Sequence, residues 1–133
     1  MSAERIDMKK IIKTEKAPLP IGPYNQAVVI GNLIYTAGQI SIDTKTNELI
    51  KGGVAEQTRL VLTHVKNILE TAGSSLEQIV KATVFLKNMN DFAEMNKVYG
   101  EFIKPETAPA RSTVEVARLP KDVLVEIEVV AHI

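Results

Sequence analysis

The longest periodic pattern of apolar residues in the chain spans residues 54–72. Its apolar side chains recur at spacings of three and four residues, and polar side chains fill the positions between them, as in a helix with one face on a sheet. Gly73 follows directly and is a natural C-terminal stop. The pattern therefore predicts one long amphipathic helix, with the apolar positions Val54, Val61, Leu62, Val65, Ile68, Leu69 and Ala72.

Apolar and β-branched runs before this helix predict three strands. A short strand is expected at residues 11–15, followed by an irregular loop at residues 17–23, where three prolines restrict the backbone. Residues 26–30 and 33–39 flank the dipeptide Gly-Asn at 31–32, which is a two-residue hairpin signal. The first part of the chain thus predicts a strand, a stiff loop and a hairpin.

A second helix is expected after a strand at residues 79–86. Residues 91–94 (Asp-Phe-Ala-Glu) resemble a capping box at the start of this helix, and Pro105 bars its continuation. The side chains that the helix is expected to bury are Phe92, Met95, Val98, Tyr99 and Phe102.

Two strand patterns near the C-terminus predict an antiparallel hairpin. Residues 111–117 and 124–132 alternate in the strand period on either side of residues 119–122. The resulting order β-β-β-α-β-α-β-β predicts an α/β domain with two helices packed on one face of a mostly antiparallel or mixed sheet. Both alternating faces of residues 79–86 and 124–132 are substantially apolar, so we expect a subunit interface to cover the other face.

The composition is that of one globular domain. The chain has 133 residues, of which 45% are hydrophobic and 24% charged, and we expect residues 1–10 to form a loosely ordered N-terminal extension. Sixteen basic residues balance sixteen acidic ones, so the chain lacks the basic surplus that favours nucleic acid as the main partner. It has neither an apolar run long enough for a membrane span nor a secretory signal. We expect a cytoplasmic location, with mitochondrial targeting as the alternative.

Several kinds of catalytic centre have no support in the sequence. There is no cysteine, and the two histidines do not form a metal-binding cluster; we expect His64 on the solvent face of the long helix and His132 in terminal-strand packing. Phosphate-binding, dinucleotide-binding and serine-hydrolase motifs are also missing. Any catalysis must therefore use Arg, Glu, Tyr, Asn, backbone amides and water, without a metal or a cofactor.

Charged residues in the last two strand patterns are the candidate catalytic groups. Arg111 starts one of them, and Glu126 and Glu128 interrupt the other. These charged residues either form the solvent-exposed face of half-buried strands or line a cleft. In a cleft, an arginine can bind a carboxylate and a glutamate can orient a water molecule. Because the register of the strands is unknown, the sequence does not decide whether Arg111 and Glu126 share a face.

Five segments of the chain form a recognisable set of motifs: residues 21–27 (IGPYNQA), 31–40 (GNLIYTAGQI), 90–92 (NDF), 109–120 (PARSTVEVARLP) and 125–128 (VEIE). In these motifs the chain resembles the Rid (YjgF) family over nearly its whole length, most closely the subgroup of imine deaminases. The resemblance implies a chorismate-mutase-like α/β subunit and a homotrimer with three clefts at the subunit boundaries.

The resemblance also implies an activity. Rid deaminases hydrolyse 2-aminoacrylate and 2-aminocrotonate, which pyridoxal-phosphate enzymes release, through their imine tautomers 2-iminopropanoate and 2-iminobutanoate. The products are ammonia and the 2-oxo acid. Carried over by position, Arg111 would clamp the substrate carboxylate and Glu126 would orient the attacking water. Tyr24 would line the cleft, the Gly38 backbone would contact the bound acid, and Asn96 matches another cleft position.

One position departs from the family pattern. Many relatives carry cysteine two residues after the arginine, where this chain has Thr113. A threonine in this substrate-binding position excludes thiolate chemistry, and it leaves the mechanism of Arg111 and Glu126 intact.

Two other functions stay open. The same cleft could bind a 2-oxo acid or a similar small carboxylate without turnover, as a regulatory module. Some family members have been described as translation inhibitors or ribonucleases, but zero formal charge and only three Phe and three Tyr make a stacking surface for nucleic acid unpromising.

Overall fold

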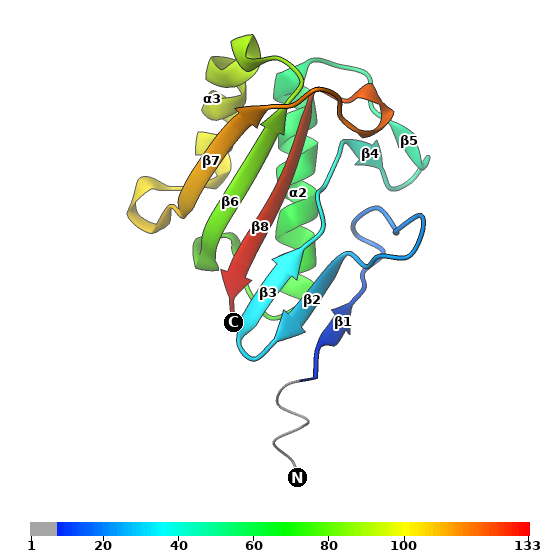
Figure 1. The fold of residues 1–133 in the computed structure, drawn as a ribbon, viewed down its shortest axis with the longest axis vertical. Coiled ribbons are helices and arrows are strands. Elements are labelled where there is room, and N and C mark those ends of the chain that lie inside the picture. Colours follow the sequence, from blue (N-terminus) through cyan, green and yellow to red (C-terminus); the bar gives the residue numbers. More distant parts are fainter. Residues whose placement is uncertain (1–7) are drawn as a thin grey trace.

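The computed structural model of the protein describes residues 8–133 and has two layers, a twisted sheet and two helices behind it (Figure 1). The strand order in the six-stranded sheet is β1-β2-β3-β8-β6-β7. The sheet contains β1 (Lys10–Ile12), β2 (Ala27–Ile30), β3 (Leu33–Thr36), β6 (Ile79–Leu86), β7 (Ala110–Glu115) and β8 (Val125–His132). The helices are α2 (Val54–Thr71) and α3 (Phe92–Phe102), and β4 (Ile42–Asp43) and β5 (Glu48–Leu49) form a separate two-stranded hairpin. Short 3-10 turns lie at Leu76–Gln78, Met89–Asp91, Pro105–Thr107 and Pro120–Asp122.

The predicted mixed sheet with two helices on one face is confirmed, but the predicted C-terminal hairpin is wrong. Strand β7 pairs in parallel with β6, and β8 pairs antiparallel with both β6 and β3 (Figure 1). Strand β6 therefore lies between β7 and β8. The connection at residues 116–124 is long enough to cross the end of β6, and alternation along a strand does not say which strand is its neighbour.

The long helix α2 matches its prediction and supplies much of the core. It spans Val54–Thr71, and Gly73 adopts φ +88° directly after it, as a C-terminal stop requires. At its start, the Glu56 carboxylate accepts a hydrogen bond from the Gly53 amide at 2.8 Å. Its fully buried side chains pack against those of β6, β8 and α3, among them Leu62, Ile68, Leu69, Val84, Leu86, Met95, Val125 and Ile127.

The second helix differs from its prediction at its first turn. Asp91 precedes the helix, but its side chain forms no capping hydrogen bond; the Asn88 side chain instead accepts one from the Asn90 amide in the preceding 3-10 turn. Met95, Val98 and Tyr99 are buried as expected and Phe102 partly so, whereas Phe92 is 37% exposed. Phe92 is the first residue of the helix.

His64 is buried, which contradicts its expected place on the solvent face. It is 2% exposed, and its Nε2 lies 2.8 Å from the Ile42 carbonyl oxygen. The apolar stripe of α2 faces the sheet, and the segment around β4 covers a second flank of the helix that helical periodicity alone does not reveal. Burial lowers the pKa of His64, although the hydrogen bond with Ile42 and the charge of Asp43 oppose this shift. His132 lies in β8, partly exposed, and its carbonyl accepts a hydrogen bond from Ser74 Oγ.

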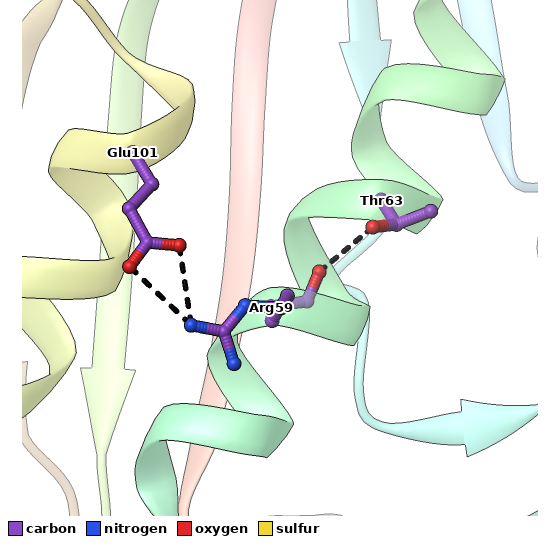
Figure 2. Close-up of polar contacts among 3 residues, drawn as sticks. All are labelled: Arg59, Thr63 and Glu101. Carbon is purple, nitrogen blue, oxygen red and sulfur yellow. Dashed lines mark hydrogen bonds and ion pairs between the residues drawn. The ribbon is translucent and has the colours of Figure 1, made fainter.

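The two helices also contact each other at the surface. Arg59 of α2 forms an ion pair with Glu101 of α3, with Nη2 3.1 Å from Oε1 (Figure 2). Thr63 Oγ1 donates to the Arg59 carbonyl one turn along (Figure 2). Within residues 8–133, no helix has the length and apolar character that a membrane crossing requires.

The sheet face opposite the helices mixes apolar and charged side chains. Tyr35 pairs with Val130, and Phe85 with Val114, on this open face. Tyr35 and Val114 are exposed, while Phe85 and Val130 are half-buried. Lys81 Nζ also lies here, 3.0 Å from Ser112 Oγ. The apolar side chains are those that led us to expect a subunit interface, which stays a prediction.

Candidate active site

The Glu126 carboxylate lies in a hollow of about 570 Å³ beside the end of β3. Glu126 is the second residue of β8, half-buried and on the open face of the sheet. Burial raises the pKa of this carboxyl, and the neighbouring charge of Glu128 adds to the shift. The hollow is lined by Pro18, Leu19, Ile21, Tyr24, Gln26, Ala37, Gly38, Gln39, Ile40, Ile42, Pro120, Lys121 and Glu126. A carboxylate with raised pKa in a largely apolar hollow is suited to hold or transfer a proton.

The absence of a side chain at Gly38 leaves room for the Glu126 carboxylate. Gln39 exchanges two backbone hydrogen bonds with Ile127, which holds the chain after β3 against β8. A Cβ built on Gly38 would collide with the Glu126 carboxylate and would lie 2.8 Å from its Cδ. Since the φ of Gly38 is outside the left-handed region, the glycine is needed for close approach and not for backbone conformation.

Gln26 fixes the proline-rich wall of this hollow. Its side chain is 2% exposed and donates to the carbonyls of Thr14, Ala17 and Pro18 at 2.8–3.1 Å, while its Oε1 accepts from the Thr14 amide at 2.7 Å. A buried amide whose donors and acceptor are all engaged makes the loop rigid. Tyr24 lies on the same wall and is 51% exposed; its hydroxyl accepts a hydrogen bond from the Ile21 amide. Gln26 was expected in a strand and belongs to the motif at residues 21–27, but neither pattern predicted its contacts with the loop.

Arg111 and Asn96 line a second hollow, of about 400 Å³, beside α3. The Arg111 guanidinium lies over the Tyr99 ring, with Cζ 4.6 Å from its centroid, and 5.6 Å from the centroid of Phe92. Among residues 8–133, Arg111 forms no ion pair with a carboxylate. Thr113 lies two residues further along the same face of β7, and its Oγ1 is buried without a hydrogen-bond partner in the described part of the chain.

The two groups of predicted site residues lie on opposite faces of the sheet. Arg111 pairs with Ala82, whose other neighbour is Val129; both neighbours are buried beneath the helices, so Arg111 shares that face. Glu126 is three residues from Val129 on a strand and therefore points to the opposite face. One chain thus brings Tyr24, Gly38 and Glu126 together, and separately Asn96 and Arg111, but it does not bring Glu126 to Arg111.

Sequence reasoning missed the aromatic surroundings of Arg111. Phe92 and Tyr99 were expected only as core residues. Their spacing of seven residues, with Asn96 between them at a helical interval, was a signal that all three lie on one face of α3. The described residues contain no group of three or more His, Asp or Glu side chains arranged to hold a metal ion.

Comparisons with known proteins agree over nearly the full chain. A profile of the family described as Endoribonuclease L-PSP matches residues 14–133. A RutC family protein of Pyrococcus horikoshii is 58% identical over 125 residues, which cover 94% of this chain and 98% of the relative. The 2-iminobutanoate/2-iminopropanoate deaminase of Escherichia coli is 53% identical over 126 residues, covering 93% and 98%. The solved structure of a Rid family protein from Yersinia pestis is similar with a TM-score of 0.92 at 43% identity, covering 95% of this chain and 100% of that chain.

Proposed function

This chain belongs to the Rid family, which the Endoribonuclease L-PSP profile describes, and we propose that it is a hydrolytic deaminase of 2-imino acids and their enamine tautomers. The E. coli relative is named for this activity. In the proposed reaction, water adds to the imine carbon and gives a tetrahedral carbinolamine. Its C–N bond then breaks, ammonia leaves, and the carbonyl of the 2-oxo acid forms. No oxidant or reductant is consumed.

Arg111 and Glu126 take the two chemical roles. The guanidinium binds the substrate carboxylate through paired N–H donors, which fixes the imine carbon relative to the protein. Glu126 removes a proton from the attacking water and returns one to the departing nitrogen. Because the pKa of Glu126 is raised toward neutral pH, the group can both accept and donate a proton efficiently. General acid–base catalysis contributes roughly 10²–10⁴-fold to the rate in enzymes, and positioning of the reactants adds to it. These contributions suit a reaction at a carbon that is already electrophilic.

The observation that carries the proposal is the separation of Arg111 from Glu126 on the two faces of one sheet. Each hollow holds half of the groups that the reaction needs. We infer that a neighbouring subunit completes each site, so that Arg111 and Asn96 of one copy face Tyr24, Gly38 and Glu126 of the next. A homotrimer arranged head to tail around a threefold axis would form three equivalent sites of this kind.

A test that separates binding from chemistry uses two variants of the full-length protein. Ammonia release is measured on 2-aminocrotonate generated in the assay by a threonine dehydratase, and binding of 2-oxobutanoate is measured by calorimetry. Arg111→Ala should nearly abolish both, because losing a charge-assisted pair in a partly desolvated cleft costs about 2–5 kcal/mol. Glu126→Gln should leave binding within a few-fold while lowering kcat by roughly 10²-fold or more.

Glu128→Gln is the matched control, since Glu128 lies two residues away on the same face of β8 and is exposed. It should keep kcat within a few-fold of wild type, because burial, the larger cause of the raised pKa of Glu126, is unchanged. Normal turnover by Glu126→Gln would remove the assigned role of Glu126. Binding of 2-oxobutanoate by wild type without any ammonia release would favour a carboxylate-binding module instead.

The family description favours one further candidate, an endoribonuclease. An RNA site needs a basic surface, and this chain has no net positive charge. Incubation of the wild-type protein with single-stranded RNA decides this point: cleavage that survives in Arg111→Ala and Glu126→Gln would assign a nuclease activity outside the proposed site.

A further inference from the structure

Two aromatic rings of α3 hold the side chain of Arg111. Its Cζ lies 4.6 Å from the Tyr99 centroid and 5.6 Å from the Phe92 centroid, both within the range of a cation–π contact. Tyr99 is 7% exposed and belongs to the core, whereas Phe92 is 37% exposed. Tyr99 is therefore the closer and the more firmly fixed of the two rings.

Helix geometry explains why these rings meet the arginine together. Phe92, Asn96 and Tyr99 are spaced four and three residues apart on α3, so they lie on one face of the helix. Asn96 and Tyr99 line the same hollow as Arg111, which projects toward this face from the edge strand β7. The helix thus presents two rings and an amide to one guanidinium.

A ring and a carboxylate hold an arginine in different ways. A carboxylate binds the in-plane N–H groups of the guanidinium, whereas an aromatic ring covers its flat face. Within residues 8–133, no carboxylate pairs with Arg111. The in-plane donors are therefore left for a ligand, while the long side chain is still kept from sampling its other rotamers.

We propose that Tyr99 is a positioning residue that holds Arg111 ready to bind a carboxylate, and that Phe92 supports it as a weaker second contact. This inference rests on the proposed role of Arg111 as the carboxylate anchor. The ring of Tyr99 performs this role, since Arg111 Cζ lies over it, 4.6 Å from its centroid. The buried hydroxyl is near enough to interact with the guanidinium charge, but it forms no hydrogen bond of good geometry among the described residues.

The test compares removal of the ring with removal of the hydroxyl. Tyr99→Leu should raise the Kd for 2-oxobutanoate and the KM for the imine by the same factor, about tenfold, as expected for a partly desolvated cation–π contact. Its kcat should stay within about threefold, since only uniform binding is lost. Tyr99→Phe keeps the ring and should bind within about twofold of wild type.

Phe102→Leu is the control for lost packing. Phe102 lies on the same helix and packs against the core, but its ring is not one of the two that lie under Arg111. This variant should lose stability as Tyr99→Leu does while keeping the wild-type Kd. A direct signature comes from NMR: ring currents should shift the Arg111 side-chain resonances upfield in wild type, Tyr99→Phe and Phe102→Leu, and less so in Tyr99→Leu.

The outcomes separate this inference from the proposed activity. If wild type binds 2-oxobutanoate but never releases ammonia, the deaminase proposal fails, and the binding and NMR comparisons still decide the role of Tyr99. Wild-type affinity in Tyr99→Leu, equal losses in Tyr99→Phe and Tyr99→Leu, or unshifted Arg111 resonances in wild type would overturn the positioning role. Absence of any 2-oxobutanoate binding by wild type would overturn both.

Discussion

At the scale of single residues, the position of Glu126 depends on the missing side chain of Gly38. The backbone conformation of Gly38 is available to alanine, and the three atoms nearest to a Cβ at this position all belong to the Glu126 side chain. That carboxylate is the far end of a flexible side chain, which can swing away at little cost in folding free energy. The chemical step, in contrast, depends on where the carboxylate lies.

We therefore expect Gly38→Ala to separate activity from stability. It should lower kcat by about 10²-fold, the effect that a displacement of roughly 1 Å has on a catalytic group. The urea midpoint of unfolding should stay close to that of wild type. Kinetics and urea unfolding on the same preparation check this, and full activity in Gly38→Ala would show that the contact with Gly38 does not place Glu126.

The individual site residues were predicted from the family resemblance more than from the alternation of apolar and polar residues. The alternation around Glu126 and Arg111 showed two charged positions in strands, but it left their relative face undecided. The two contacts that shape the site, Glu126 against Gly38 and Arg111 over Tyr99, join residues far apart in the sequence. No local pattern encodes such contacts, because they depend on which strands and helices become neighbours.

At the scale of elements, a buried histidine connects α2 to the segment around β4. His64 Nε2 must donate to the Ile42 carbonyl, which leaves Nδ1 as an unprotonated acceptor. This Nδ1 is buried without a partner among residues 8–133, so the folded protein disfavours the protonated ring. Ile42 and its neighbour Ile40 line the Glu126 hollow, so the connection supports one wall of the site.

The lowered pKa of His64 predicts that the fold weakens in mild acid. The unfolded chain takes up a proton near pH 6.5, whereas the folded protein does so only at lower pH. The contribution of His64 to stability is thus fully present above pH 6.5 and is lost as the pH falls through the folded pKa. Urea unfolding at pH 8 and pH 5.5, at fixed protein concentration, should show a smaller acid loss in His64→Gln than in wild type.

His132→Gln is the matched control for this experiment. It removes the other histidine, at the partly exposed end of β8, and should keep the full acid loss of wild type. An acid loss of equal size in wild type and His64→Gln would show that His64 is not the group responsible.

The ion pair between α2 and α3 is expected to matter little. Both side chains of the Arg59–Glu101 pair are 49% exposed (Figure 2). Exposed pairs of this kind contribute about 0.2–1 kcal/mol, because water screens the charges and the side chains lose conformational freedom. Glu101→Gln should lower the free energy of unfolding by no more than this, and the difference should vanish in 1 M salt. A larger, salt-insensitive loss in urea titrations would contradict the expectation.

Elements could be predicted from the sequence far better than their arrangement. The long helix and strand β6 appear where periodicity placed them, and the hairpin signal at Gly31 matches a glycine with φ +58°. The order of the last strands was wrong, since β6 separates β7 from β8. Apolar alternation identifies a strand, but pairing is decided by tertiary packing and by the length of connections.

At the scale of the whole molecule, the open sheet face and the divided site suggest an oligomer. Residues 1–7, which hold most of the expected N-terminal extension, lie outside the described part of the chain. We expect sedimentation equilibrium at micromolar protein to give a mass near three times 14.6 kDa. A monomer under these conditions would leave each chain with half a site and would remove the proposed site assignment.

The most direct test of a site shared between two copies is complementation between two inactive variants. Arg111→Ala and Glu126→Gln are unfolded together in urea and refolded as an equal mixture, with each variant and wild type refolded alone as controls. After random reassembly, roughly three quarters of the trimers are mixed, and one of the three sites in each mixed trimer combines an intact Arg111 from one copy with an intact Glu126 from another, so about a quarter of all sites are intact. Ammonia release should therefore return to about a quarter of the refolded wild-type rate. A mixture no more active than the two variants refolded alone, while wild type recovers its rate, would show that Arg111 and Glu126 do not act across a subunit boundary.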